Sequence, residues 1–185
     1  IRAADTDRIP LAEVADNVVV ILDETFYDPA LLTKYYSHSG GDVTPNLHRI
    51  FRNYPSGYMY SPEYGGGTAN VEFAVLTGLS NYWATGVVPY VNVIPKLDSR
   101  MSAASWAKDY GFDTTAIHAF DGSMYKRNLA YARFGIDTFI DQEKMKYTEH
   151  DSKSAYINDE SVFKEVLDLL EDGEESQMVL AVTMM

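Results

Sequence analysis

A threonine that directly follows three glycines is the clearest candidate for chemistry in this sequence. Residues 65–73 read Gly-Gly-Gly-Thr-Ala-Asn-Val-Glu-Phe, and an apolar pattern of helical period begins within them. The glycines predict a backbone that passes where no side chain would fit, and a threonine that starts a helix lies at the positive end of its dipole. An anion is stabilised at the same place, so Thr68 is a candidate nucleophile for a phosphate or sulfate ester. The alternative is a flexible loop followed by a threonine that only caps the helix.

A carboxylate is the natural partner for such a hydroxyl. Glu24 follows a run of β-branched residues at 17–22, and it is a hard oxygen donor. Together with a deprotonated Thr68 it could hold Mg²⁺ or Mn²⁺, which would lower the pKa of the hydroxyl and neutralise developing charge. The alternative for Glu24 is a solvated carboxylate near the start of a helix.

Three residues from later in the chain are candidates for contacts with a phosphate group. His118 ends a predicted strand, where it could donate to a phosphate or bind a metal; a hydrogen-bonded histidine at a strand end is the alternative. Arg127 could clamp a phosphate with two parallel hydrogen bonds, and Tyr125 could pack against the substrate. The alternative for this segment is an amphipathic helix with exposed cations.

The elements that must position these residues alternate between strand and helix. The run at 17–22 is typical of a strand buried on both faces, and open α/β sheets bind ligands at the carboxyl edge of their strands. We therefore predict an α/β fold with a mainly parallel sheet flanked by helices. The expected strands are 17–22, 58–61, 114–118, 138–140 and 178–184, and the expected helices are 29–36, 44–51, 71–79, 99–110, 124–134 and 159–170.

Composition limits the classes of function. The 185 residues are 46% hydrophobic, enough for the core of one domain, and 15 basic against 27 acidic residues give a formal net charge of −12. This charge argues against nucleic acid as a partner and against simple adhesion to an anionic membrane surface. There is no cysteine, which excludes disulfides and thiolate metal sites. We find no signal peptide or transmembrane span, because the longest aliphatic run, at 18–22, is far too short.

The order and the residue sequences of these segments resemble those of a known family. Residues 20–26, 61–80 and 116–128 are similar to the lipoteichoic acid synthase group, which belongs to the sulfatase and alkaline phosphatase superfamily. The glycine–threonine segment is the most specific part, and residues 134–141 and 181–184 add weaker agreement. The resemblance implies an alkaline phosphatase-like fold in which 17–185 form the N-terminal part of a sulfatase-like catalytic domain, after a lead-in or linker at 1–16.

The resemblance also implies a role for each candidate residue. Thr68 matches the family's nucleophilic threonine, which carries a covalent phosphoglycerol intermediate, and Glu24 matches an acidic ligand of its single divalent metal, Mn²⁺ or Mg²⁺. His118 and Arg127 match contacts to the substrate phosphate. Tyr125 stands where many members have tryptophan, so that a contact with the glycerol group is implied.

The implied reaction belongs outside the cell membrane. In the family, phosphatidylglycerol supplies a phosphoglycerol unit to a glycerol phosphate polymer or glycolipid acceptor on the extracellular face of a bacterial membrane. A transmembrane region that is not in this chain typically anchors the domain. The family's other metal ligands, an Asp-His pair and a further Asp, would lie beyond Met185, as would a histidine after the last strand. We therefore expect residues 1–185 alone to bind metal poorly, to turn over no substrate and to expose one face or edge of the sheet.

Two other functions stay open on the sequence. A hydrolase on the same scaffold could be a phosphodiesterase or a sulfatase, but the chain has no cysteine and Ser61-Pro62 does not fit the formylglycine pattern, which disfavours sulfate chemistry. A non-catalytic domain that binds glycerol phosphate is the other.

Overall fold

The chain forms two compact units. In the computed structural model, the first comprises residues 1–24 and 62–185, and the second comprises Thr25–Ser61. The structure describes residues 15–32, 34–35, 39–61, 63, 65–80, 88–96, 101–173 and 175–184, apart from the side chain of Pro95. Most of the predicted lead-in, residues 1–14, lies outside these residues.

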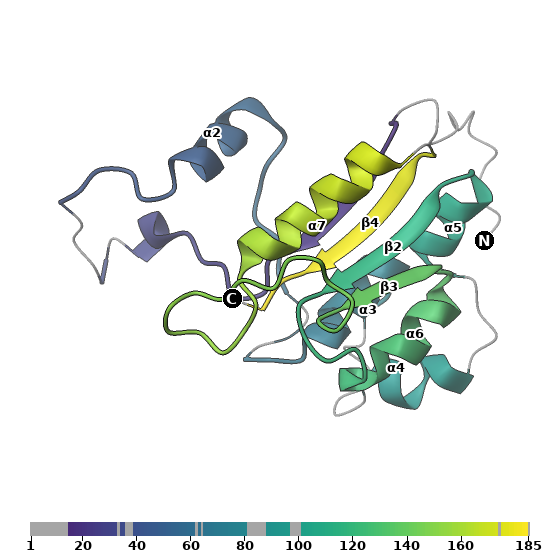
Figure 1. Cartoon of the computed structure of the whole chain (residues 1–185). Helices are drawn as coiled ribbons and strands as arrows, with labels where there is room; N and C mark the ends of the chain where they lie inside the picture. Colours follow the sequence, from purple (N-terminus) through teal and green to yellow (C-terminus); the bar gives the residue numbers. More distant parts are fainter. Residues whose placement is uncertain are drawn as a thin grey trace, which may run out of the picture. The chain divides into compact units, whose positions relative to one another are not determined.

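A parallel sheet of four strands forms the centre of the first unit (Figure 1). Its strands are β1 (Val18–Leu22), β2 (Asp113–His118), β3 (Thr138–Asp141) and β4 (Gln177–Val182). Their order across the sheet is β1-β4-β2-β3, and all three pairings are parallel. This confirms the predicted parallel α/β architecture, and it brings the carboxyl ends of all four strands to one edge.

The strands differ in burial according to their place in the sheet. All six residues of β4 are buried because this strand lies between two others. The prediction that β1 is buried on both faces is wrong, since Val19 is 36% and Ile21 is 48% exposed. β1 is an end strand among the described residues, and its side chains alternate between half-buried and exposed. The β-branched residues of β1 therefore reflect a preference for strand conformation and not complete burial of the strand.

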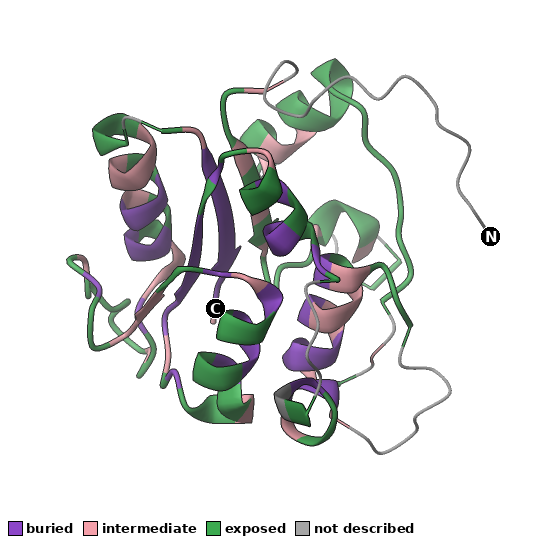
Figure 2. Cartoon of the chain, turned by 90° about the vertical axis from the view of Figure 1, so that its right-hand side faces the viewer, coloured by how far each residue is buried: buried purple, intermediate pink, exposed green. Residues whose placement is uncertain are grey.

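Helices cover both faces of the sheet, and Figure 2 shows buried residues on the strands and on the helix faces turned toward them. The helices of this unit are α3 (Thr68–Thr77), α4 (Pro89–Asn92), α5 (Ala103–Asp109), α6 (Arg127–Phe134) and α7 (Asp159–Asp172). Alternate residues of β4 separate two hydrophobic clusters. Met178 and Leu180 pack with residues of α3 to α6, whereas Val179 and Ala181 pack with residues of α7.

Helix α5 is shorter than its pattern predicts. The expected helix at 99–110 begins instead at Ala103, and residues 99–100 lie outside the described part. Ser102 and Ser105 form a reciprocal capping box: each hydroxyl accepts the backbone N–H of the other residue, at 3.0 and 3.1 Å. The helix starts where these side chains satisfy its first N–H groups.

The second unit contains α2 (Pro45–Asn53), with its proline in the first turn as predicted. A short 3-10 turn at Pro29–Leu32 replaces most of the helix expected at 29–36, of which residues 33 and 36 are not described. The strand expected at 58–61 is wrong, because these residues pair with no described strand. No described residue of this unit is buried.

In the second unit, the imidazole of His48 lies between the carboxylates of Asp28 and Asp42. His48 Nε2 lies 3.0 Å from an oxygen of Asp28, and Nδ1 lies 2.8 Å from the carboxylate of Asp42. A neutral imidazole has only one N–H donor, so the double contact favours the imidazolium. Hydrogen bonds to Asp42 and Asp28 accordingly raise the pKa of His48.

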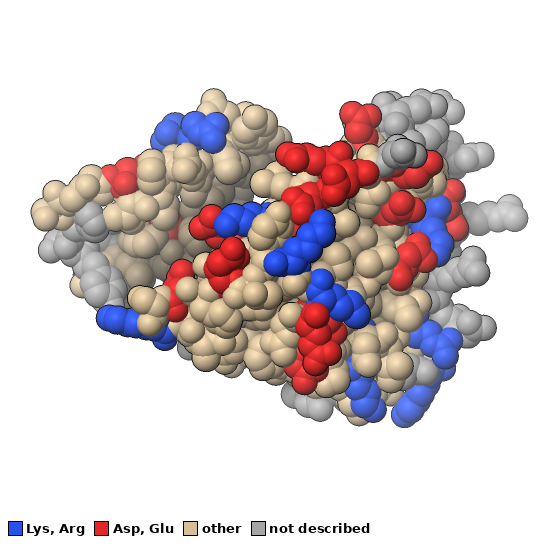
Figure 3. Space-filling model, viewed as in Figure 1, with Lys and Arg blue, Asp and Glu red and all other residues tan. Residues whose placement is uncertain are grey.

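The surface reflects the acidic composition. On the face that carries α7, acidic side chains form larger clusters than basic ones (Figure 3). Within the described residues, the structure has no helix of sufficient length and apolarity to cross a membrane.

Candidate active site

The glycine loop delivers Thr68 to the first position of α3. Gly65, Gly66 and Gly67 have φ values of 73°, 130° and 80°, and Gly67 is the N-cap of the helix. The expectation that side chains would not fit here is wrong: a Cβ at Gly65 or Gly66 meets no described atom within 4 Å. The glycines are needed for their left-handed backbone, which other residues adopt only with strain. Thr68 itself is buried, and it is 8% exposed.

Glu24 lies beside Thr68 because two strand ends hold it there. The Thr68 hydroxyl donates a hydrogen bond to Glu24 Oε1. The backbone N–H of Glu24 donates to the Thr183 hydroxyl at 3.1 Å, and this hydroxyl donates to Asp23 at 3.2 Å. The N–H of Thr183 in turn donates to the carbonyl of Leu22 at 3.1 Å. The end of β4 therefore fixes the position of the carboxylate that follows β1.

The electrostatic environment of Glu24 suits either a proton or a cation. Partial burial raises its pKa; the positive charge of Arg127 acts against this shift, and the negative charge of Glu72 adds to it. Burial also raises the pKa of the neighbouring Asp23, against its hydrogen bond from Thr183. Both carboxylates would gain from a positive partner.

Arg127 is buried and paired with a glutamate of α3. It is 1% exposed, and Glu72 is fully buried. Arg127 Nη2 lies 2.7 Å from Glu72 Oε1, and Nε lies 3.1 Å from the same oxygen. Tyr131 donates to Glu72 Oε2 at 2.6 Å. Burial alone would lower the pKa of Arg127, but the charge and hydrogen bonds of Glu72 outweigh it and raise this pKa.

Tyr125 covers the Arg127 guanidinium at a break in the backbone. Its ring centroid is 5.2 Å from the guanidinium carbon, a cation–π distance. The helix predicted over 124–134 is interrupted here, because Tyr125 and Lys126 have φ values of 56° and 58°. Such left-handed residues cost about 1–2 kcal/mol each. Only after this break does α6 begin, at Arg127.

His118 lies at the end of β2 as a neutral acceptor. Burial, and then the positive charge of Arg127, lower its pKa to about 4. Its Nδ1 lies 3.2 Å from the carbonyl of Val182, which can only accept, so we assign the proton to Nδ1. Nε2 is buried with no hydrogen-bond partner among the described residues. A contact from Nε2 to a phosphate oxygen would therefore require protonation, which an anionic ligand favours.

The structure joins four of the five predicted residues in two contacting pairs, and the fifth, His118, ends β2. Thr68 touches Glu24, Tyr125 touches Arg127, and the Arg127 charge acts on both Glu24 and His118. Sequence reasoning missed the residues that hold this arrangement, which are Glu72, Tyr131 and Thr183. Glu72 did leave a signal, because it is a lone charge within the apolar run of α3.

The donor set at this edge fits part of a divalent cation site. The carboxylate of Glu24 and the hydroxyl of Thr68 are hard oxygen donors in direct contact, as Mg²⁺ or Mn²⁺ prefers. The described residues contain no group of three or more acidic, histidine or cysteine side chains arranged to hold a metal. Glu24 and Thr68 therefore fit as two ligands of a cation that needs more.

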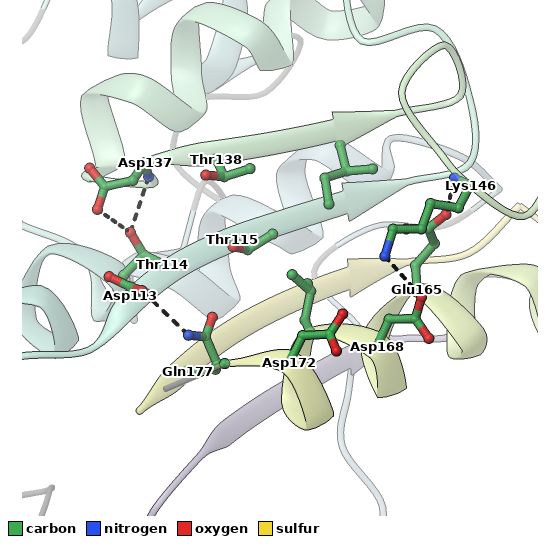
Figure 4. Close-up of a pocket in the computed structure, with 13 residues that line it drawn as sticks. Asp113, Thr114, Thr115, Asp137, Thr138, Lys146, Glu165, Asp168, Asp172 and Gln177 are labelled. Atoms are coloured by element: carbon green, nitrogen blue, oxygen red, sulfur yellow. Dashed lines mark hydrogen bonds and ion pairs between the residues drawn. The ribbon is translucent and has the colours of Figure 1, made fainter. Parts of the chain in front are cut away.

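A separate hollow lies away from these residues. It has a volume of about 380 Å³ and lies between α7 and the beginnings of β2, β3 and β4 (Figure 4). Five of its lining residues are acidic, and one of them, Asp168, pairs with Lys146 at 3.0 Å. None of the predicted site residues lines it. The chemistry suggested by the sequence is therefore not in this hollow.

These observations define a parallel α/β domain with a polar site at the carboxyl edge of its sheet. Residues 16–185 match the sulfatase family model, and the chain belongs to this family. A solved protein of the alkaline phosphatase superfamily from Vibrio parahaemolyticus has the same fold, with a TM-score of 0.61 and 19% identity over 91% of this chain and 40% of that chain.

Relatives with more specific names share the same region. The chain is 33% identical to a candidate cyclic beta-1,2-glucan modification protein of Rhizobium meliloti (strain 1021), over 96% of this chain and 28% of that protein. It is 27% identical to a lipoteichoic acid synthase of Staphylococcus saprophyticus, over 71% of this chain and 21% of that protein. The chain thus spans less than a third of these relatives.

Two solved structures resemble it closely. The phosphoglycerol transferase GacH of Streptococcus pyogenes, in complex with sn-glycerol-1-phosphate, has a TM-score of 0.76 and 29% identity, over 92% of this chain and 45% of that chain. The lipoteichoic acid synthase LtaP of Listeria monocytogenes has a TM-score of 0.74 and 18% identity, over 91% of this chain and 40% of that chain, which supports the shared fold.

Proposed function

We propose that the protein to which this chain belongs is a phosphoglycerol transferase. The observation that carries the proposal is the contact between Thr68 and Glu24 at the start of a helix, where the positive charge of the buried Arg127 guanidinium acts on Glu24. A nucleophilic oxygen, a carboxylate that accepts its hydrogen bond and the fixed positive charge of a guanidinium are groups that favour phosphoryl transfer. The names of the similar transferase and synthase proteins support this class of reaction.

The first step transfers the phosphoglycerol group to the protein. Thr68 Oγ, whose hydroxyl donates a hydrogen bond to Glu24 Oε1, attacks the phosphorus of phosphatidylglycerol and loses its proton. The bond from phosphorus to the diacylglycerol oxygen breaks, and this oxygen takes up the proton that Thr68 has lost and leaves as an alcohol. Arg127 stabilises the phosphate oxygens, and Tyr125 packs beside the glycerol group.

The second step releases the group to an acceptor. A hydroxyl of a glycerol phosphate polymer or a glycolipid attacks the phosphorus and displaces Thr68 Oγ, and the proton that the acceptor hydroxyl loses restores the Thr68 hydroxyl. His118 Nε2 is a buried acceptor, and the hydroxyl of this incoming group would donate a hydrogen bond to it. Water in place of the acceptor would give hydrolysis.

A divalent cation, Mn²⁺ or Mg²⁺, completes the proposal. Glu24 and Thr68 would hold it together with ligands from outside the described residues. When bound, it lowers the pKa of the hydroxyl and neutralises negative charge on the phosphate. Sequencing of the coding DNA beyond codon 185 tests this part: an Asp-His pair in a continuing frame supplies ligands, and a stop codon there would contradict it.

We also propose that the reaction occurs on the extracellular face of a bacterial membrane, where the lipid donor resides. A membrane segment elsewhere in the complete protein would provide the anchor. Fractionation of cells that express the complete protein, followed by protease treatment of intact cells, tests this location. Protection of the domain from external protease would contradict it.

The test of the reaction compares two threonines of the same helix. Full-length protein with Thr68→Ala should lose transfer of labelled glycerol from phosphatidylglycerol to an acceptor. Thr77→Ala is the matched control, because the Thr77 hydroxyl lies at the other end of α3, where it donates to the carbonyl of Phe73 and accepts the N–H of Leu79. Retention of more than about a tenth of the wild-type rate by T68A would refute the nucleophile. Release of free glycerol phosphate by the wild type, without transfer, would indicate a hydrolase.

A further inference from the structure

Glu72 is a fully buried carboxylate that the proposed reaction does not use. It lies on α3 and binds both Arg127 and Tyr131. Burial of a charge is costly unless it is paired and hydrogen-bonded, and even a buried ion pair often stabilises a fold no more than apolar residues of similar volume would. A gain in folding stability is therefore a weak explanation for the burial of the ion pair between Glu72 and Arg127.

The geometry divides the Arg127 guanidinium into two edges. Glu72 occupies Nε and Nη2, at 3.1 and 2.7 Å. Among the described residues, the one hydrogen bond of Nη1 is a long one, 3.5 Å from the carbonyl oxygen of Met124. Because a guanidinium is a rigid planar fork, fixing one edge also fixes the direction of the other.

Glu72 and the candidate nucleophile belong to one rigid element. Thr68 and Glu72 are four positions apart on α3, so their side chains lie on the same helix face. The helix that presents the Thr68 hydroxyl therefore also sets the position of Arg127. The left-handed backbone at Tyr125 and Lys126, directly before Arg127, is the kind of strain that is retained at functional sites.

We propose that Glu72 is a positioning residue for phosphate recognition. It holds the guanidinium of Arg127 so that the Nη1 edge is directed to a phosphate group seated at Thr68. This inference rests on the proposed function. It assigns to Glu72 an effect on the affinity for phosphoglycerol that acts through Arg127 and not through the amount of folded protein.

A double-mutant cycle on the full-length protein tests the proposal. The variants are Glu72→Gln, Arg127→Lys and the combination, and the measurement is the dissociation constant for sn-glycerol-1-phosphate by calorimetry. The glutamine of E72Q keeps the shape and one acceptor oxygen but not the charge. We expect E72Q to weaken binding about tenfold when Arg127 is present and less than about twofold in the R127K background, because lysine cannot form the fork.

Glu165→Gln is the matched control. Glu165 is another buried glutamate, 2% exposed, but it lies on α7 and accepts the backbone N–H of Tyr147 at 2.9 Å. E165Q should lower the melting temperature and leave the dissociation constant unchanged. If E72Q does not fold, Glu72→Asp carries the same test, since it keeps the charge and withdraws the carboxylate by one methylene.

The outcomes distinguish a failure of the positioning role of Glu72 from a failure of the proposed reaction. Equal loss from E72Q in both backgrounds, or wild-type affinity of E72Q and E72D, would overturn the positioning role. Absence of glycerol phosphate binding by the wild type would overturn it as well. If the cycle shows coupling while T68A still transfers phosphoglycerol, the positioning role stands and the proposed nucleophile fails.

Discussion

The hydrogen bond from Tyr131 to Glu72 gives a sharp prediction about stability. Both residues are buried, at 1% and 0% exposure, and their oxygens are 2.6 Å apart. Burial, and then the charge of Glu72, raise the pKa of Tyr131 well above its ordinary value, so the hydroxyl stays a donor at working pH. A hydrogen bond to a charged group contributes about 1.5–3 kcal/mol.

The perturbation is Tyr131→Phe, which removes the hydroxyl and keeps the ring. The edge contacts of the ring with Tyr90 and Phe139, at centroid distances of 6.0 and 4.8 Å, are retained. Glu72 also keeps its hydrogen bonds from Nε and Nη2 of Arg127. We therefore expect the free energy of unfolding to fall by about 1.5–3 kcal/mol, from the lost bond alone.

Urea unfolding of the full-length protein, followed by fluorescence and by circular dichroism, measures this change. Tyr147→Phe is the control: its hydroxyl also donates to a carboxylate, at 3.2 Å from Asp168, but both groups are only partly buried. Y147F should change stability by less than about 0.5 kcal/mol. An equal effect of Y131F and Y147F would refute the reasoning that burial makes this bond strong.

Three further predictions concern the loop, the second unit and the strand end. Gly67→Ala places a side chain at a φ of 80°, so it should lower stability by about 1–2 kcal/mol; an unchanged urea midpoint would contradict this. The pKa of His48 is raised above 6.5 by its two aspartates, so the stabilisation that it provides is complete below pH 6.5 and is lost as pH rises through the raised value. Hydrogen-exchange protection of 25–61 should fall over that range in the wild type, and protection that does not depend on pH would disprove the effect. Thr183→Val removes the acceptor for the N–H of Glu24 and should lower the transfer rate, whereas Thr183→Ser should keep it; equal rates would show that this anchor is unimportant.

Much of the fold follows from local patterns. The apolar run of β4 and the proline that starts α2 each predicted the right element, because these signals depend on nearby residues. The exposure of β1 and the absence of a strand at 58–61 could not be predicted in this way. Both depend on which strands lie alongside, and the sequence pattern of a single strand does not contain that information.

In the candidate site, too, features that depend on nearby residues were predicted, and contacts between distant residues were not. Thr68 and Glu24 were predicted from the glycine loop and the strand end, which are local features. The partner of Arg127 was not, since Glu72 is 55 positions away and only the packing of α3 against the start of α6 brings the two together. The break at Tyr125 also escaped prediction, because neither it nor Lys126 is a glycine and nothing local favours a positive φ there.

The covalent intermediate on Thr68 tests the central claim most directly. Full-length protein would be incubated with phosphatidylglycerol and no acceptor, quenched in acid, digested and examined by tandem mass spectrometry. The account predicts one phosphoglycerol group on Thr68 itself, lost when acceptor is added and absent from the T68A variant. Transfer of phosphoglycerol without any adduct on Thr68, or with the adduct on another residue, would contradict it.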